Sequence, residues 1–248
     1  MEQLRDKEKG CEWDKEQDFK SIAPFTIEEA YEVADAIARE NHNDLKLELG
    51  DLLLQVVFLS QIAKEEGLFK FEDVANAISH KLISRHPYVF ENPKEHTPDE
   101  QLESWEHSKA KEREELNFTS LMDDIALTLP ALMRSQKIQK RASRVGFDWS
   151  SIEGYFKKIE EETGELKKAI QNKDQSNIEE EIGDLLMILT NLSRHLKVDA
   201  EAALHKSNRK FEKRFRYIED ELEKKGKKLS DSSLEEMDKL WDEAKLIN

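Results

Sequence analysis

The sequence predicts an all-α protein that contains two tandem helical repeats. Nearly every long segment carries its apolar residues at a helical period, and no alternating strand pattern interrupts these segments. Proline (5) and glycine (8) are scarce and lie mainly where the segments end. One acidic pattern also recurs 133 residues further along the 248-residue chain without an insertion, which indicates a duplication.

Four helices are expected in the first repeat. Two of the starts are marked by threonines that are followed three residues later by a glutamate, as in capping boxes, and two of the ends by glycine or proline. The starts are Thr26 with Glu29 and Thr97 with Glu100, the stops are Gly67 and Pro87, and the helices span residues 26–41, 44–65, 71–85 and 98–115.

The second repeat is expected to contain four helices as well, at residues 151–172, 177–196, 200–225 and 232–246. Ser176 with Glu179, and Asp199, are the expected starts, and Gly226 is the expected C-terminal cap. Between the repeats, Pro130 precedes a further expected helix, Ala131–Ser143. The predicted organisation is an N-terminal domain (residues 1–116), a helical linker (117–147) and a C-terminal domain (148–248).

Composition narrows the classes of function. Hydrophobic and charged residues each make up 38% of the chain, which is typical of a charge-rich globular protein. A net charge of −15 disfavours nucleic acid and anionic membranes as partners. No apolar run approaches the roughly 20 residues that span a bilayer, and the first residues lack the apolar stretch of a signal peptide. The lone Cys11 fits a reducing compartment, so we expect a cytoplasmic location.

The duplicated acidic pattern predicts a carboxylate site in each repeat. Its acids keep their spacing, whereas the residues between them differ. Glu28, Glu29, Glu32, Glu48, Gly50 and Asp51 recur as Glu161, Glu162, Glu165, Glu181, Gly183 and Asp184. A single such pattern would be interpreted as a solvated acidic face, but two in the same register argue against chance.

Helix geometry indicates what these acids can do. Glu29 and Glu32 share one face of a helix, and Glu48 and Asp51 share one face of the next, so four carboxylates could converge. The apolar stretch 52–59 that follows suggests that the acids lie beside buried packing. Carboxylates in such a place take up protons or bind a cation, and oxygen ligands suit Mg²⁺ or Mn²⁺. The mid-helix glycines indicate either close helix packing or a role in shaping the site.

These residues carry a family resemblance. Glu-Glu-x-x-Glu followed by Glu-x-x-Asp, present in both repeats, resembles the MazG-type nucleoside triphosphate pyrophosphohydrolases. Supporting stretches at residues 11–14, 85–90 and 144–149 are also similar, and the resemblance extends over nearly the whole chain. It implies an all-α, Mg²⁺-dependent enzyme that cleaves nucleoside triphosphates between the α and β phosphates, with broad base and sugar acceptance and a house-cleaning task.

The resemblance also implies roles for individual residues. By position, Glu162, Glu165, Glu181 and Asp184 would bind Mg²⁺, and Glu29, Glu32, Glu48 and Asp51 are their counterparts. We expect Glu28 and Glu161 to orient or deprotonate the attacking water. The expected substrate contacts are Lys81, Arg85, Trp105, Lys109, Lys158, Asn177, Lys210, Arg214, Trp241 and Lys245.

Each basic pair has four-residue spacing, which places its members on one helical face, able to grip successive phosphates. A solvated basic face is the alternative, and each tryptophan could instead be a core residue. The basic run from Arg134 to Arg144 could pair with the acidic domains or bind phosphate or nucleic acid.

Several alternatives remain open from the sequence. The chain could be a helical scaffold that binds nucleotide or metal without turnover, or a narrower pyrophosphatase for deoxyuridine or deoxycytidine triphosphate. Glu-x-x-His and a glycine-rich phosphate loop are both absent, which argues against a di-iron bundle and a P-loop ATPase. Both repeats keep the acidic set, and the second is slightly favoured as the active one. The apolar stretches 52–59 and 185–192 favour a homodimer that completes each bundle.

Overall fold

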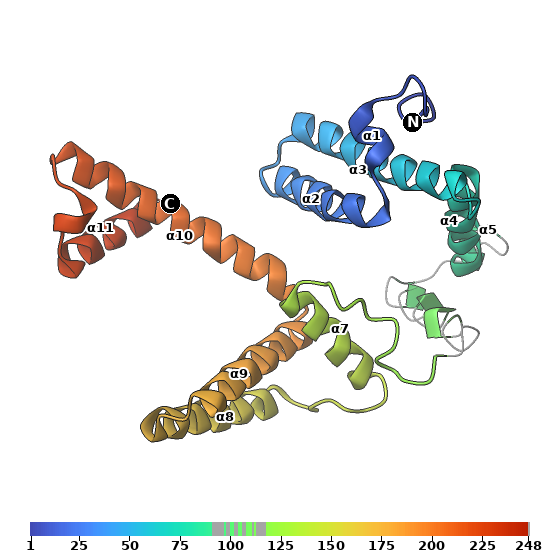
Figure 1. Cartoon of the computed structure of the whole chain (residues 1–248). Coiled ribbons are helices and arrows are strands. Elements are labelled where there is room, and N and C mark those ends of the chain that lie inside the picture. Colours follow the sequence, from blue (N-terminus) through green and yellow to red (C-terminus); the bar gives the residue numbers. More distant parts are fainter. Residues whose placement is uncertain are drawn as a thin grey trace. The chain divides into compact units, whose positions relative to one another are not determined.

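The fold was analysed on a computed structural model, which describes residues 1–90, 97, 100, 101, 104, 105, 108–110, 112 and 118–247. Every regular element in these residues is a helix, and no strand occurs among them, so the all-α prediction is confirmed. The chain forms two compact units, Met1–Arg113 and Glu114–Asn248 (Figure 1).

The first unit is built on an antiparallel helical hairpin. Helix α2 (Phe19–Ala38) packs along α3 (His42–Glu65), and α4 (Phe71–Arg85) follows α3, as Figure 1 shows. Ile22, Phe58 and Ile62 form the buried cluster between α2 and α3. The short helices α1 (Glu12–Glu16) and α5 (Pro87–Phe90) flank this unit in sequence.

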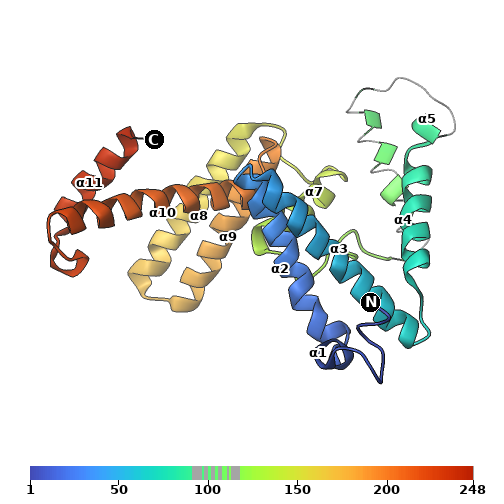
Figure 2. The ribbon, with the colours of Figure 1, turned by 90° about the horizontal axis from the view of Figure 1, so that it is seen from above.

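The second unit repeats the hairpin and adds a second one. Helix α8 (Ile152–Asn172) packs along α9 (Gln175–His195), and α7 (Ala131–Ser143) packs against α9. Helix α10 (Ala200–Lys224) pairs with α11 (Leu234–Leu246), with the short 3-10 helix η1 (Leu229–Asp231) between them (Figures 1 and 2). The α10–α11 hairpin has its own buried cluster, Ile218, Leu222 and Leu240.

The two acidic hairpins turn in the same way. Glu40 and its counterpart Lys173 both adopt the left-handed conformation, with φ of 55° and 56°. The next residue caps the second helix in each repeat, because Asn41 accepts backbone N–H bonds from α3 and Asp174 accepts one from α9. The strict register of the duplicated pattern therefore corresponds to a turn geometry that both repeats share.

Two predicted helix starts are wrong. Helix α2 begins seven residues before Thr26, because Asp18 accepts the N–H bonds of Lys20 and Ser21, while the Thr26 hydroxyl donates to the Ile22 carbonyl inside the helix. Pro24 interrupts only one backbone bond near the helix start, so the helix tolerates it. Helix α9 begins at Gln175, capped by Asp174 rather than by Ser176.

Other predicted boundaries are confirmed. Asp199 caps α10 through the N–H of Ala202, and Gly67 and Gly226 follow α3 and α10 with positive φ. The Thr97–Glu100 capping box is formed in both directions, although most of the expected helix 98–115 lies outside the described residues. Helix α7 has the bounds expected from the sequence, and α4 ends at Arg85, before Pro87.

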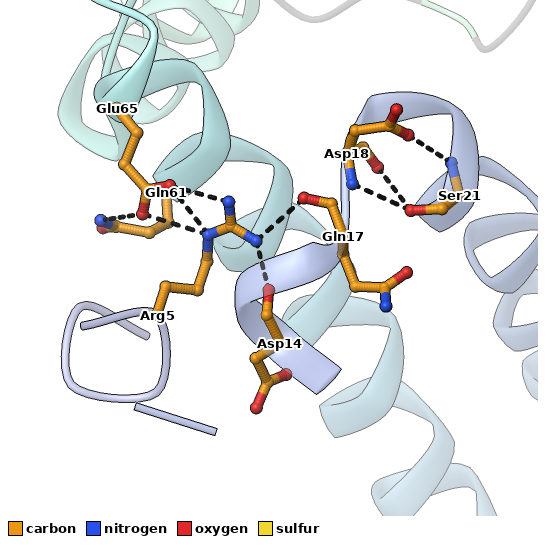
Figure 3. A network of polar contacts seen from close by, with 7 residues as sticks. All are labelled: Arg5, Asp14, Gln17, Asp18, Ser21, Gln61 and Glu65. Carbon is orange, nitrogen blue, oxygen red and sulfur yellow. Dashed lines mark hydrogen bonds and ion pairs between the residues drawn. The ribbon is translucent and has the colours of Figure 1, made fainter. Parts of the chain in front are cut away.

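The N-terminal segment is clasped to the first hairpin by one guanidinium group (Figure 3). Arg5 donates to both carboxylate oxygens of Glu65 and to the backbone carbonyls of Asp14 and Gln17, and it lies over the ring of Phe58. The hydrogen bond from Arg5 lowers the pKa of Glu65. The clasp therefore joins the first residues, helix α1 with its C-terminal end, and the end of α3.

The prediction that the apolar stretches are buried is only partly right. Phe58 and Ile188 are buried, but Leu53, Leu54 and Leu186 are exposed, and so are further apolar residues of both hairpins. A two-helix hairpin covers one face of each helix, whereas these helices are apolar on more than one face. No described helix combines the length and the apolar character needed to cross a membrane.

Candidate functional site

The first acidic site lies on the facing sides of α2 and α3. Carboxylate oxygens of Glu29, Glu48 and Asp51 can lie within 4.8 Å of one another. Gln55, one turn beyond Asp51, is buried and donates a hydrogen bond from its Nε2 to Glu29 Oε1 at 3.5 Å. Burial raises the pKa of Glu29 and of Glu48, and the nearby charges of Glu32 and Asp51 raise both further. This site therefore gathers negative charge that a cation would relieve.

The second acidic site has the same construction on α8 and α9. Glu162, Glu181 and Asp184 form one group with oxygens within 4.8 Å, and Glu161, Glu162 and Glu165 form another. Glu162 is shared by both groups and is only 4% exposed. The two helices thus bring five predicted site residues together.

One oxygen at this second site is left without a partner. Glu181 is 8% exposed, and its Oε2 atom is buried without a hydrogen bond. Burial raises the pKa of Glu181, and the neighbouring Glu162, Glu165 and Asp184 raise it further. A buried acceptor without a donor, among other carboxylates, is what a hard divalent cation satisfies. The residues of this site therefore fit Mg²⁺ or Mn²⁺.

Lys158 lies within the second acidic site. Its Nζ atom is 2.6 Å from Glu162 Oε1 and 2.8 Å from Glu161 Oε1, one helical turn away. Burial alone would raise the pKa of Glu162, but the hydrogen bond from Lys158 outweighs it and lowers this pKa. The sequence placed Lys158 on the substrate side, and the structure adds its direct contact with the carboxylates.

The mid-helix glycines do not mark close packing within this chain. An added Cβ atom at Gly50 or at Gly183 would meet no atom within 4 Å. Both residues lie on exposed faces of their helices, away from the partner helix of the hairpin. The interpretation of tight packing is therefore wrong for the described chain.

The basic and aromatic residues of the first repeat form a separate cluster. Lys109 Nζ lies 3.9 Å from the centre of the Trp105 ring, and the Arg85 guanidinium lies 5.9 Å from the same ring. Arg85 also grips Glu112 with two nitrogens, at 2.8 Å and 2.5 Å, which lowers the pKa of Glu112. Lys81, one turn before Arg85, is exposed.

The equivalent cluster of the second repeat is formed by α10 and α11. The guanidinium of Arg214 lies 5.5 Å from the centre of the Trp241 ring, and its Nε atom is buried without a hydrogen bond. Phe211 packs against the same tryptophan ring at 5.0 Å. Lys210 is exposed, and Lys245 pairs with Asp242 at 2.7 Å.

The acidic and basic parts of the second unit do not meet. Among its described residues, no hydrogen bond or ion pair joins the α10–α11 hairpin to Glu162, Glu165, Glu181 or Asp184. Asn177 is half-buried one turn before Glu181, so it is close in sequence to the acids rather than to Arg214.

Glu28 is exposed beside the first acidic site.

The basic run on α7 has structural contacts. Arg141 donates to the backbone carbonyls of Leu121 and Asp123 and pairs with Asp124. These partners lie in the segment that precedes α7, so the contacts of Arg141 do not show the expected pairing of the run with the acidic domains.

Sequence reasoning missed two contacts of these clusters. Gln55 corresponds to Ile188, and Glu112 has no acidic counterpart in the second repeat, so neither residue belongs to the duplicated pattern. Comparison of the repeats for differences, rather than for shared residues, could have found them.

Comparisons with known proteins agree with the duplicated hairpins. The family described as the MazG nucleotide pyrophosphohydrolase domain matches residues 17–90 and 150–218, one acidic hairpin in each segment. The chain is 50% identical to the nucleoside triphosphate pyrophosphohydrolase of Escherichia coli K12, over 99% of this chain and 94% of that protein. It is 47% identical to the Thermotoga maritima protein named nucleoside triphosphate pyrophosphohydrolase/pyrophosphatase MazG, over 99% of this chain and 92% of that one. The uncharacterized protein YabN of Bacillus subtilis is 42% identical over 95% of this chain and 48% of its own length.

Proposed function

Because this chain belongs to the MazG nucleotide pyrophosphohydrolase family, we propose that it hydrolyses nucleoside triphosphates to monophosphate and pyrophosphate. This is a hydrolase reaction on an acid anhydride, and broad substrate acceptance would suit the removal of unwanted nucleotides. The observation that carries the proposal is the unpartnered Oε2 of Glu181 among converging carboxylates.

In this proposal the acids of each hairpin hold Mg²⁺, for which Mn²⁺ could substitute. Glu162, Glu165, Glu181 and Asp184 bind the ion in the second repeat, and Glu29, Glu32, Glu48 and Asp51 bind it in the first. When bound, Mg²⁺ offsets the charge of the triphosphate and lowers the pKa of a bound water. The lysines and arginines of the basic clusters grip the phosphates, and Trp241 or Trp105 stacks on the base.

The second repeat is the better candidate for turnover. Among the described residues Arg214 is paired with no carboxylate, whereas its counterpart Arg85 forms two hydrogen bonds to Glu112. A carboxylate that occupies the guanidinium fork competes with phosphate for the same hydrogen bonds. The division into residues 1–116, 117–147 and 148–248 would then separate a supporting domain, a linker and a catalytic domain.

We infer a homodimer from two features of single chains. The hairpins leave apolar residues such as Leu53, Leu54 and Leu186 uncovered, and the α10–α11 cluster lies apart from the acids that it should serve. A second copy could cover the apolar faces and bring basic residues to the acidic site. We also propose a cytoplasmic location, which the lone Cys11 and the nucleotide substrates favour.

The reaction can be tested by product analysis. We expect purified protein with Mg²⁺ to convert a panel of ribo- and deoxynucleoside triphosphates to monophosphate and pyrophosphate in equal amounts. A chelator should abolish both products, because without a cation the negative carboxylates of the site repel the negative triphosphate. Ion chromatography resolves monophosphate, diphosphate, pyrophosphate and phosphate in one run.

The same assay distinguishes the alternatives. Diphosphate plus phosphate as products would contradict cleavage between the α and β phosphates. Nucleotide binding without any product would favour a scaffold protein, and turnover of only deoxyuridine or deoxycytidine triphosphate would favour a narrow enzyme.

Glu161 is proposed to orient or deprotonate the attacking water, as Glu28 would in the first repeat. Replacing Glu161 by Gln is expected to lower kcat by about 100-fold, the lower range for loss of general-base catalysis. Steady-state kinetics at saturating nucleoside triphosphate check this, and an unchanged kcat would exclude the role.

A further inference from the structure

The two acidic sites have corresponding carboxylate residues. They differ in the residue that lies one helical turn before the first proposed ligand. The residue four positions before the first shared ligand is Phe25 in the first repeat and Lys158 in the second. Phe25 packs edge-to-face against Trp13, with ring centres 6.0 Å apart, so an aromatic residue occupies the place of an ammonium group. The duplicated sites therefore carry different net charge.

The lysine pairs with the carboxylate that both acidic groups of the second site share. Lys158 Nζ lies 2.6 Å from Glu162 Oε1, and Glu162 also belongs to the group with Glu181 and Asp184. At the first site, Glu29 instead accepts a long hydrogen bond, 3.5 Å, from the neutral amide of Gln55. Among the described residues, no ion pair is formed with Glu29, Glu48 or Asp51 of the first site, so a divalent ion meets repulsion from a paired ammonium group only at the second site.

The ammonium group of Lys158 can also leave the carboxylates. Its stem is long and flexible, and its side chain is 36% exposed, so its ammonium group is accessible to solvent and to a ligand. A triphosphate brought to the ion supplies oxygens that can replace Glu162 and Glu161 as partners. The ammonium group would then stabilise the substrate instead of the empty carboxylates.

We propose that Lys158 is an internal cation that holds the second acidic site until a phosphate ligand displaces it, whereas the first site binds a divalent ion without nucleotide. Lys158 thereby makes metal binding at the second repeat dependent on the substrate. This rests on the proposed function only in that the acidic clusters are taken as metal sites.

Binding of Mn²⁺ alone tests the proposal, with free Mn²⁺ measured by electron paramagnetic resonance at pH 8. The Glu29→Gln/Glu48→Gln variant isolates the second site, and adding Lys158→Met to it is expected to tighten Mn²⁺ binding by about tenfold or more. Lys157→Met is the matched control, because Lys157 is the exposed neighbour on the same helix and should leave the affinity unchanged. Conversely, Phe25→Lys should weaken the first site in a Glu162→Gln/Glu181→Gln background, with Phe25→Met as its control.

Adding adenosine 5′-(α,β-methylene)triphosphate, which cannot be cleaved at the proposed bond, should remove most of the difference in Mn²⁺ affinity that Lys158→Met produces. Equal Mn²⁺ affinity with and without this replacement in the absence of nucleotide, or a difference that the analogue leaves unchanged, would overturn the proposal. Circular dichroism melts establish that each variant is folded. If neither pair of Glu→Gln replacements alters Mn²⁺ binding, the metal assignment itself fails, which is distinguishable from a wrong role for Lys158.

Discussion

Replacing Glu162 and Glu165 together by glutamine is expected to reduce pyrophosphate release by more than about 100-fold. Loss of a residue that only supports a metal ligand costs about 10–100-fold, so removal of two proposed ligands should cost more. Glu162 is also the residue shared by both carboxylate groups of the second site. Initial rates with Mg²⁺, and Mn²⁺ binding on the same samples, measure the effect.

Two further variants serve as controls for the Glu162→Gln/Glu165→Gln result. Glu160→Gln/Glu180→Gln removes the same charge from exposed positions of α8 and α9 and should keep at least about half of the activity. Glu29→Gln/Glu32→Gln removes the counterparts in the first repeat and should be the milder lesion. Near-normal turnover of the Glu162/Glu165 variant would move the active site to the first repeat.

The largest expected effect on stability is at Tyr155. This residue is 0% exposed, packs against the rings of Trp149 and His195, and donates its hydroxyl to Asp148 Oδ1 at 2.6 Å. Arg194 pairs with Asp148 at 2.6 Å and also donates to the Tyr155 oxygen at 3.2 Å. Tyr155→Ala is expected to lower the free energy of unfolding by about 3–5 kcal/mol, because it leaves a cavity and strands this network.

The neighbouring residue provides a control for this stability prediction. Phe156→Ala should cost less than about 1 kcal/mol in urea denaturation, because Phe156 is 52% exposed. Tyr155→Phe keeps the ring and should cost about 1–2 kcal/mol for the lost hydrogen bonds. Equal destabilisation by Tyr155→Ala and Phe156→Ala would contradict the expectation that the buried Tyr155 ring stabilises the fold by packing.

The Tyr155 hydroxyl also makes the free energy of unfolding depend on pH in the alkaline range. Burial raises the pKa of Tyr155 from 10.0 to about 12, and its bond to Asp148 contributes to the shift. A group with a raised folded-state pKa stabilises the protein fully below its unfolded pKa, and this stabilisation is lost as pH rises through the folded value. The wild type should therefore lose stability relative to Tyr155→Phe above pH 10.

Much of this structure follows from periodicity and from the duplication. The helix class and the α3, α4 and α7 regions could be predicted because each depends on local pattern. The acidic sites could be predicted because three-residue spacing, as in Glu162 and Glu165, places two acids on one helical face, and the short turn between α8 and α9 brings Glu181 beside them. Helix starts were less accurate, because Asp18 and Asp174 compete with nearby threonine and serine as caps, and only the backbone decides between them.

Contacts distant in sequence were beyond this reasoning. Arg194 and Asp148 are 46 residues apart, and nothing in their spacing marks them as partners. Gly154 is a further example, since a Cβ atom there would lie 2.5 Å from Trp149, a constraint that only the folded chain reveals. Differences between the repeats, such as Phe25 in place of Lys158, do not belong to the shared pattern from which the sites were predicted.

The Arg5 clasp has a consequence for the order of events during synthesis. Arg5 and Glu65 are 60 residues apart, so at about 5–20 residues per second the ribosome delivers Glu65 roughly 3–12 seconds after Arg5. Helix formation takes about a microsecond, so α1 and α2 have ample time to form first. The N-terminal segment, although translated first, can therefore complete this clasp only after the whole of α3 has been translated.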